Sequence, residues 1–298
     1  EAVSGLPAAA AQVYRSRAAA VRIVDLLDRA EPDPEDDAAP PSSSAPHREA
    51  VPPTAALRAN GLTCGWSARR PVVEDVDLTL TPGRSTAIVG VSGAGKTTLL
   101  ATLAGLLPPI AGTVEVGGVP LGALPRTAIA ETVAFIAEDA HVFATTVLEN
   151  LRVANGRATP QEATAALRST GLSEWLEGLP DGLDTLLGPG GSTVSGGERR
   201  RLLLARALLS PARFLLLDEP GEHLDPDSAD RLMSLVLGLP RETGRAVAIV
   251  THRVGALGQA DEVAMVDDRH LAARGTHSHL AATSQAYCAA LAAEEADR

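Results

Sequence analysis

One short segment restricts the possible folds of this 298-residue chain more than any other, the glycine-rich stretch Gly90–Thr97. Its sequence, GVSGAGKT, fits the pattern GxxxxGK[ST] at every fixed position. The residues before it, Ser85–Val89, read as a short buried strand, and Thr97–Ala104 reads as a helix. Because strand, glycine loop and helix follow one another as they do where this pattern binds phosphate, a chance glycine-rich turn is the weaker interpretation.

The residue types of this loop suit a phosphate ligand. Backbone N–H groups and the N-terminus of the following helix attract anions. Lys96 is the only lysine among 26 basic residues, and its flexible ammonium can reach terminal phosphate oxygens as a point charge. The Thr97 hydroxyl would ligate Mg²⁺. The loop residues predicted to hold the phosphates or their metal are Gly90, Ser92, Gly93, Gly95, Lys96, Thr97 and Thr98.

The composition argues against several other classes of protein. A net charge of −11, with no basic cluster beyond Arg199–Arg201, argues against a nucleic-acid surface, which needs many cations. The two cysteines, Cys64 and Cys288, offer neither a disulfide framework nor metal-ligand spacing, which is consistent with a reducing cytoplasm. There is no run of about 18–20 apolar residues, so we expect no membrane span in this chain and a soluble fragment.

The chain divides into three regions. In residues 8–28, apolar side chains recur at three- and four-residue spacing, which predicts an amphipathic helix that ends before Pro32. One such helix cannot bury its apolar face alone, so residues 1–30 read as the end of a larger helical assembly. Residues 31–56, rich in proline and acidic residues, predict a flexible linker, and residues 57–298 form the main domain.

The main domain mixes strands and helices. Early strands are expected near 57–63, 73–80 and 113–116. Further strand-like runs at 85–89, 213–218 and 246–251 alternate with helical stretches, which predicts a parallel sheet, and a helical section spans about 146–208.

A second motif lies at Phe214–Glu219, where an apolar strand ends in two acids. Such a strand places its carboxylates at the carboxyl edge of a parallel sheet, where ligands bind in open α/β folds. We expect Asp218 to hold Mg²⁺ and Glu219 to act as general base toward the attacking water. An acidic strand end at a surface turn is the alternative, which the upstream loop disfavours.

Between these motifs, Ser195-Gly-Gly-Glu198 opens a helix that extends to about Leu208. This helix N-terminus is a second candidate anion site. Two phosphate sites in a chain with one lysine suggest a composite site, in which Ser195, Gly196, Gly197 and Glu198 of one protomer close over the nucleotide of another. A plain serine-capped helix is the alternative.

These motifs, in this order over residues 57–290, resemble those of ATP-binding cassette (ABC) ATPases. The resemblance implies ATP and Mg²⁺ as ligands, and an α/β phosphate-loop fold with a RecA-like core, an antiparallel β subdomain and a helical subdomain. It also implies that His252 contacts the γ-phosphate, that Trp66 stacks on adenine and that Asp225, at the end of Glu222-His-Leu-Asp225, lies at a dimer interface near the nucleotide. With Glu219 and Lys96, His252 completes the predicted catalytic set.

Two positions depart from the family pattern. Glu138 stands where the family carries a glutamine that faces the metal and the transport domain, and Glu198 replaces the usual glutamine after Ser-Gly-Gly. A carboxylate at 138 can still offer oxygen to Mg²⁺, but it adds negative charge beside Asp218 and Glu219. A regulatory subunit that holds ATP while its partner hydrolyses it is therefore a second hypothesis.

Three segments resemble exporters in particular: residues 8–28, like the end of a last transmembrane helix, residues 184–192 and residues 260–277. Residues 137–151 and 194–201 further resemble the CydC family, one half of a heterodimeric thiol exporter that supports cytochrome bd assembly. The resemblance implies a CydD-like partner subunit that completes the ATP sites, a transmembrane domain, and a place on the cytoplasmic face of the membrane. The glutathione or cysteine cargo would not touch this part of the protein. A DNA-repair or translation ATPase fits poorly, since the interval from Lys96 to Ser195 is too short for a coiled-coil insertion.

Overall fold

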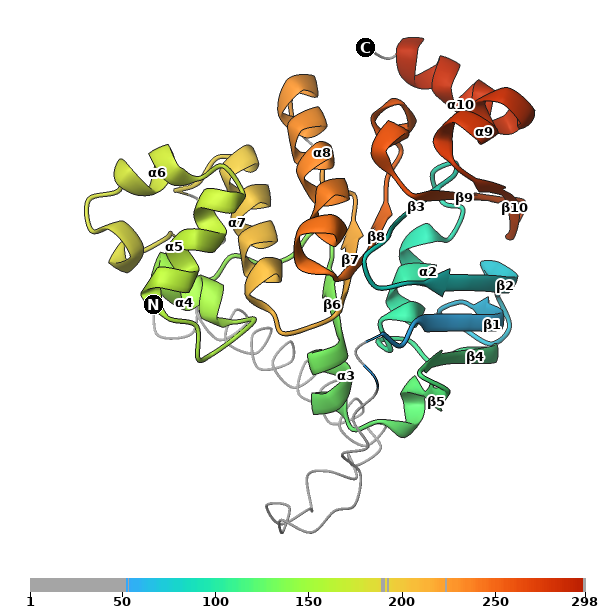
Figure 1. Ribbon diagram of the computed structural model, residues 1–298, viewed down its shortest axis with the longest axis horizontal. Helices are drawn as coiled ribbons and strands as arrows, with labels where there is room; N and C mark the ends of the chain where they lie inside the picture. The colour runs from blue at the N-terminus through green and yellow to red at the C-terminus, as the bar shows by residue number, and fades with distance from the viewer. Residues whose placement is uncertain (1–51, 53, 189–190, 192, 223, 297–298) are drawn as a thin grey trace, which may run out of the picture. The chain divides into compact units, whose positions relative to one another are not determined.

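The computed structural model describes residues 52, 54–188, 191, 193–222 and 224–296. They belong to one compact unit, residues 51–298 (Figure 1). The helix predicted at 8–28 lies outside the described residues, as does the predicted linker apart from Pro52 and residues 54–56. Among the described helices, none combines the length and the apolar character needed to cross a bilayer.

The centre of this unit is a six-stranded sheet with the strand order β10-β9-β3-β8-β7-β6. Five neighbouring strands are parallel, and β10 pairs antiparallel with β9 at one edge. The strands are β3 (Ser85–Val89), β6 (Val133–Ile136), β7 (Phe214–Asp218), β8 (Ala246–Val250), β9 (Glu262–Asp267) and β10 (His270–Gly275). The parallel sheet predicted from the runs at 85–89, 213–218 and 246–251 is confirmed.

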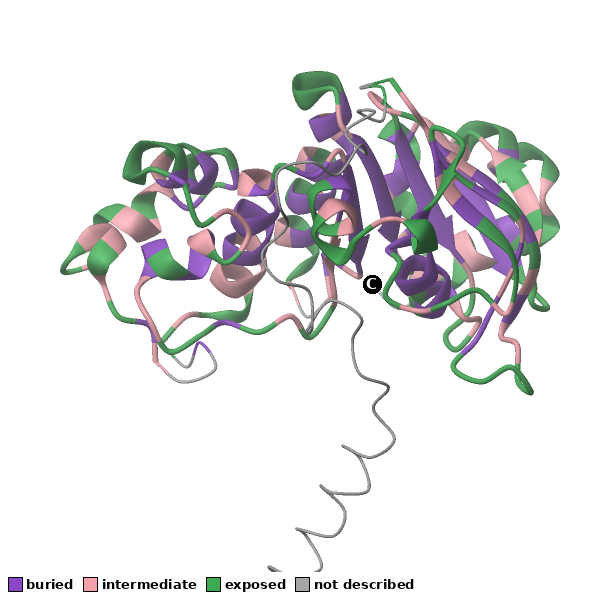
Figure 2. Cartoon of the chain, turned by 90° about the horizontal axis from the view of Figure 1, so that it is seen from below, coloured by how far each residue is buried: buried purple, intermediate pink, exposed green. Residues whose placement is uncertain are grey.

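Both faces of this sheet are covered, which explains why its strands read as continuous apolar runs. Alternate side chains enter different cores: Phe214 and Leu216 pack on one face of β7, and Leu215 and Leu217 on the other. The second core includes residues of α8 (Pro226–Thr243), η4 (Val254–Gln259), α9 (His277–Thr283) and α10 (Gln285–Ala296). Figure 2 shows the strands as the most continuously buried part of the fold.

The first core lies under a second, antiparallel sheet with the order β2-β1-β4-β5. Its strands are β1 (Leu57–Cys64), β2 (Val73–Leu80), β4 (Ala111–Val116) and β5 (Val119–Pro120), which confirms the three early strands. The helix α2 (Lys96–Leu103) contacts both sheets through side chains such as Leu99, Leu100 and Leu103. Between β5 and β6 lie η1 (Leu121–Ala123) and α3 (Arg126–Thr132).

A helical region with its own core follows β6 (Figure 1). It contains α4 (Val147–Arg152), α5 (Pro160–Ser169), α6 (Ser173–Glu177), η2 (Gly182–Asp184) and α7 (Gly196–Leu209). The predicted helical section is thus confirmed as several short helices. One reason for the breaks is local: Thr159 closes a capping box with Glu162 and Pro160 occupies the first turn, so α5 has to begin there.

Candidate nucleotide site

Four parallel strands bring most of the predicted site residues to one edge of the sheet. The phosphate loop follows β3, Glu138 follows β6, Asp218 ends β7, and His252 follows β8. Two backbone hydrogen bonds hold the strand ends together: Thr251 N donates to Ile88 O at 3.2 Å, and Glu219 N donates to Val250 O at 3.0 Å. The sequence folds this way because parallel strands end on the same side.

The loop needs glycine at its two ends. At Gly90, with φ of 153°, a β-carbon would lie 2.3 Å from the carbonyl oxygen of Val266. At Gly95, the left-handed N-cap of α2, a β-carbon would lie 2.7 Å from a methyl group of Val73. A side chain at either position would therefore displace the loop from β9 or from the antiparallel sheet.

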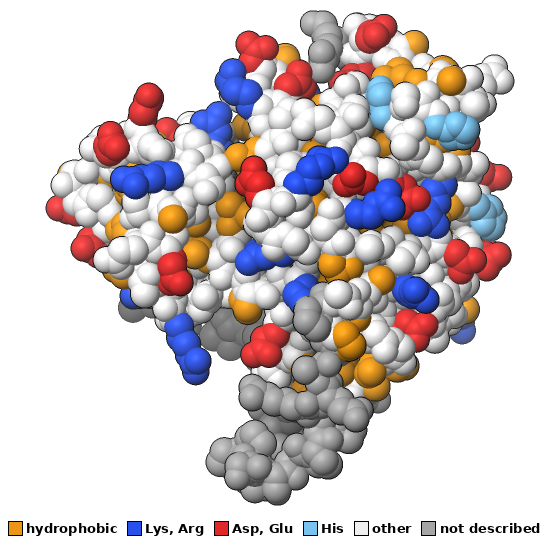
Figure 3. All heavy atoms as spheres, in the orientation of Figure 1, with side chains coloured by type: hydrophobic (Ala, Val, Ile, Leu, Met, Phe, Trp, Pro, Cys, Tyr) orange, Lys and Arg blue, Asp and Glu red, His pale blue; other side chains and the backbone are white. Residues whose placement is uncertain are grey.

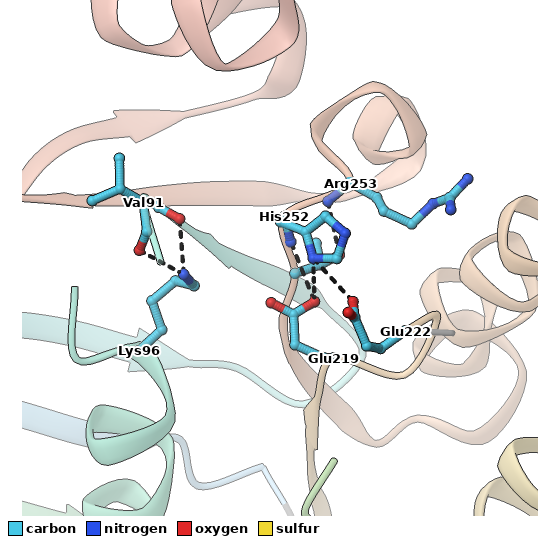
Figure 4. A network of polar contacts seen from close by, with 8 residues as sticks. Val91, Lys96, Glu219, Glu222, His252 and Arg253 are labelled. Atoms are coloured by element: carbon cyan, nitrogen blue, oxygen red, sulfur yellow. Dashed lines mark hydrogen bonds and ion pairs between the residues drawn. The ribbon is translucent and has the colours of Figure 1, made fainter. Parts of the chain in front are cut away.

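Lys96 lies inside this loop as the first residue of α2. Its ammonium donates to the carbonyl oxygens of Gly90 at 2.8 Å and Val91 at 3.0 Å (Figure 4). Burial lowers the pKa of Lys96, and the nearby carboxylates of Glu219 and Asp218 oppose that shift. Lys96 is 7% exposed and lies near Asp218, the last residue of β7, and Glu219, which follows it.

Asp218 has the properties of a metal ligand. It is 3% exposed, and its Oδ1 atom is buried without a hydrogen-bond partner among the described residues. Burial raises the pKa of this carboxyl group, a side-chain hydrogen bond from Thr97 lowers it, and the charges of Glu219 and Glu138 raise it further. An orphaned carboxylate oxygen beside a hydroxyl and two more carboxylates fits a hard cation such as Mg²⁺, which prefers oxygen ligands.

A cavity of about 550 Å³ joins this cluster to Trp66, a size typical of small-molecule sites. Its lining includes the apolar side chains of Leu106 and Phe135 and the polar side chains of Thr97, Glu138 and Asp218. Trp66 is 74% exposed, so it has no role in the core. The exposed indole leaves a ring face available for stacking. Thr98, also predicted to bind the nucleotide, is 6% exposed and lies buried within α2.

His252 and Glu219 lie in direct contact (Figure 4). The imidazole Nδ1 is 3.1 Å from Glu219 Oε2, and His252 N donates to the same oxygen at 3.3 Å. Glu219 adopts a left-handed φ of 44°, which turns the chain sharply after β7. The hydrogen bond to Glu219 raises the pKa of His252, with a further contribution from Glu222.

Glu222 is a site residue whose contact with His252 was not predicted. Its Oε2 atom lies 3.3 Å from His252 Nδ1, and the three side chains bring their polar atoms within 4.8 Å of one another. The signal available in the sequence was an acidic residue within the segment Glu222–Asp225. That pattern alone does not reveal a histidine partner 30 positions away.

The residues expected to serve a second protomer lie at helix starts. Ser195 is the N-cap of α7, where its hydroxyl and the Glu198 carboxylate form a capping box. Gly196 and Gly197 form the first turn of α7. Asp225 caps α8 by accepting from Ser228 N at 2.9 Å. Hydrogen bonds from the side chain and, second, the backbone of Ser228 lower the pKa of Asp225. The side chains of Ser195 and Glu198 hydrogen-bond within this helix start, and among the described residues no hydrogen bond joins either side chain to the phosphate loop of the same chain.

Comparison with known proteins agrees with this geometry. The sequence matches the ABC transporter family over residues 73–222, and the chain belongs to that family. Over 227 residues it is 36% identical to the mycobactin import ATP-binding/permease protein IrtA of Mycobacterium tuberculosis, covering 76% of this chain and 26% of IrtA. It is 33% identical to the glutathione/L-cysteine transport system protein CydC of Bacillus subtilis, covering 81% of this chain and 41% of CydC.

A solved structure of a bacterial Atm1-family ABC exporter with ATP bound has the same fold. Its TM-score is 0.74 at 25% identity, and the match covers 81% of this chain and 42% of that one. The predicted ABC cassette fold is therefore confirmed. The chain spans about a quarter to two fifths of the length of these relatives.

Proposed function

We propose that the chain is the ATP-binding and ATP-hydrolysing part of an ABC exporter. The observation that carries this proposal is the convergence of Lys96, Asp218 and Glu219 at one sheet edge, next to a cavity that is lined in part by an exposed tryptophan. The family membership and the relatives with joined ATP-binding and permease parts support the same conclusion.

In the proposed reaction the loop N–H groups and Lys96 hold the phosphates of ATP. Mg²⁺, when bound by Thr97, Asp218 and Glu138, would offset phosphate charge and orient the γ-phosphate. Glu219 accepts a proton from water as the water oxygen bonds to the γ-phosphorus. The bond from that phosphorus to the bridging oxygen breaks, and ADP leaves with the electron pair. His252 donates a hydrogen bond from Nε2 to the γ-phosphate.

A second protomer completes the site in this proposal. Ser195, Gly196 and Gly197 of one subunit face the γ-phosphate held by the other, because the N-terminus of α7 presents unpaired N–H groups. Asp225 would lie at the same interface. Binding of ATP draws the subunits together, and hydrolysis releases them.

The proposed setting is a CydC-like half of a heterodimeric exporter of glutathione or cysteine, paired with a CydD-like subunit at the cytoplasmic face of the membrane. The resemblance of residues 137–151 and 194–201 supports this choice. IrtA, which is 36% identical and is named for mycobactin import, supports a cargo other than a thiol equally well. An exporter of another substrate is therefore the alternative within the same class.

The side chain of Glu138 favours one further candidate function. A regulatory subunit that binds ATP while its partner hydrolyses it would tolerate a carboxylate near Asp218. The close contact of Glu219 with His252 favours hydrolysis instead.

The test uses the chain assembled with its proposed partner subunit, because a second protomer completes the site, and measures Mg·ATP binding by calorimetry and phosphate release by a coupled assay. Lys96→Ala should lose binding, whereas Glu219→Gln should bind ATP and lose turnover by at least about a hundredfold. The remote, exposed Glu177→Gln serves as control. Unchanged turnover in both site variants would refute the proposal. Tight ATP binding without turnover, persisting in Glu138→Gln, would favour the regulatory subunit.

A further inference from the structure

The mechanism above leaves out Glu222, although its carboxylate reaches the same imidazole nitrogen as that of Glu219. The two oxygens lie 3.3 and 3.1 Å from His252 Nδ1. Figure 4 shows both carboxylates directed at one edge of the ring, while the Arg253 side chain extends away. Because a carboxylate only accepts hydrogen bonds, Nδ1 has to carry the proton that the two glutamates share.

The backbone fixes the place of Glu222. Its N–H donates to the carbonyl oxygen of Glu219 at 3.1 Å, closing a turn directly after β7. Pro220 and Gly221 in this turn are buried, and a β-carbon on Gly221 would meet Ala229 of α8 at 3.4 Å. The second carboxylate is therefore held beside His252 by the packing of the turn on α8.

The charges around the ring favour its doubly protonated form. Glu219 and Glu222 face it from the segment after β7, and both raise the pKa of His252. Arg253 opposes them, but its guanidinium pairs with Asp230 of α8 at 3.0 Å. With Nδ1–H engaged, Nε2 can donate to a phosphate oxygen only when the ring is an imidazolium.

The geometry points to Glu222 as a positioning residue for His252, which keeps Nδ1–H bound while Glu219 turns to accept the proton of water. Glu219 binds the ring through Oε2 alone, and any turn toward the water weakens that contact, whereas Glu222 keeps its own hydrogen bond to Nδ1–H. The inference rests on the proposed hydrolysis of ATP, and it assigns to Glu222 the task of keeping Nε2 aimed at the γ-phosphate through the reaction.

The first experiment observes His252 without ATP. In the ¹⁵N-histidine-labelled chain, the His252→Asn variant identifies the His252 signals among those of seven histidines. Glu222→Ala should shift the neutral ring toward the Nε2–H tautomer and lower its pKa. Glu222→Gln, which retains an acceptor oxygen, should keep the Nδ1–H tautomer but lower the pKa. The exposed Glu177→Ala should change neither, and Tm values show which variants are folded.

The second experiment measures ATP turnover in the complex with the proposed partner subunit. Glu222→Ala should lower kcat about tenfold, the loss of one charge-assisted hydrogen bond, and leave KM for Mg·ATP within about twofold. Identical imidazole signals in the variants, or an unchanged kcat, would overturn the role of Glu222 while an active wild type upholds hydrolysis. If the Glu222 variants change the imidazole signals of His252 but the wild-type protein shows no ATP turnover, Glu222 positions His252 and the proposed hydrolysis is refuted. If Glu222→Ala fails to fold, the pKa of His252 in the Glu222→Gln variant provides the test instead.

Discussion

The guanidinium of Arg206 binds both oxygens of Asn150: Nε donates to the backbone carbonyl at 2.8 Å, and Nη2 donates to Oδ1 at 3.0 Å. Its Nη1 donates to the carbonyl of His141 at 2.8 Å, and burial lowers the pKa of Arg206 to about 10. The buried guanidinium of Arg206 thus links α7 to α4 and to the segment that follows Glu138. Arg199 and Arg200 bind carbonyls in the same segment, those of Ala140 and Glu138.

We expect Arg206→Lys to destabilise the domain by about 2–4 kcal/mol. A lysine ammonium cannot reproduce the planar, forked set of N–H donors of the guanidinium, so it would leave buried oxygens of Asn150 or His141 unpaired. Urea unfolding followed by circular dichroism measures this change. The exposed Arg168→Lys on α5 should stay within about 0.5 kcal/mol of the wild type. Equal stability of the two variants would contradict the structural role of Arg206.

The phosphate loop offers a test of backbone geometry. Gly90→Ala combines a φ of 153° with a β-carbon 2.3 Å from the carbonyl of Val266, so it should cost about 3 kcal/mol or more. Gly118→Ala also has a positive φ, 84°, but meets open space, and should cost about 1–2 kcal/mol. Thermal unfolding of both variants compares them directly. A smaller loss at Gly90 than at Gly118 would show that β9 does not confine the loop.

Glu138→Gln should affect metal and nucleotide in opposite directions. Removing the exposed carboxylate of Glu138 beside Asp218 should raise the half-saturating Mg²⁺ concentration for ATP turnover several-fold. The affinity for ATP without metal should increase, because the triphosphate meets one fewer negative charge. Calorimetry with and without Mg²⁺ separates the two effects. If Glu138→Gln changed the affinity for Mg²⁺ and the affinity for metal-free ATP in the same direction, a metal role for Glu138 would be excluded.

Stability should depend on pH through His252. Its folded pKa is raised above the ordinary 6.5, so the ion pair with Glu219 stabilises the fold fully below about pH 6.5. That contribution is lost as the pH rises through the higher folded pKa. The difference in unfolding free energy between wild type and His252→Asn should therefore shrink from pH 6 to pH 8.5. A difference that grows with pH would contradict the ion pair.

Local patterns predicted the parts of the site that follow directly from a strand. The phosphate loop between β3 and α2, and the two acids at the end of β7, could be predicted from the buried runs and the residues next to them in the sequence. The pairing of Glu222 with His252 could not be predicted, because it depends on β7 and β8 being adjacent in the sheet. Buried Arg206 likewise contradicts the usual exposure of charged side chains, and its carbonyl partners carry no sequence signal.

The solitary lysine has a practical consequence. A lysine-specific protease has one cleavage site in the chain, directly after Lys96, and would yield fragments 1–96 and 97–298. That residue is 7% exposed and its ammonium is tied to the loop carbonyls, so cutting requires the start of α2 to unwind. The digestion rate therefore reports how often this junction opens, and added ATP should slow it.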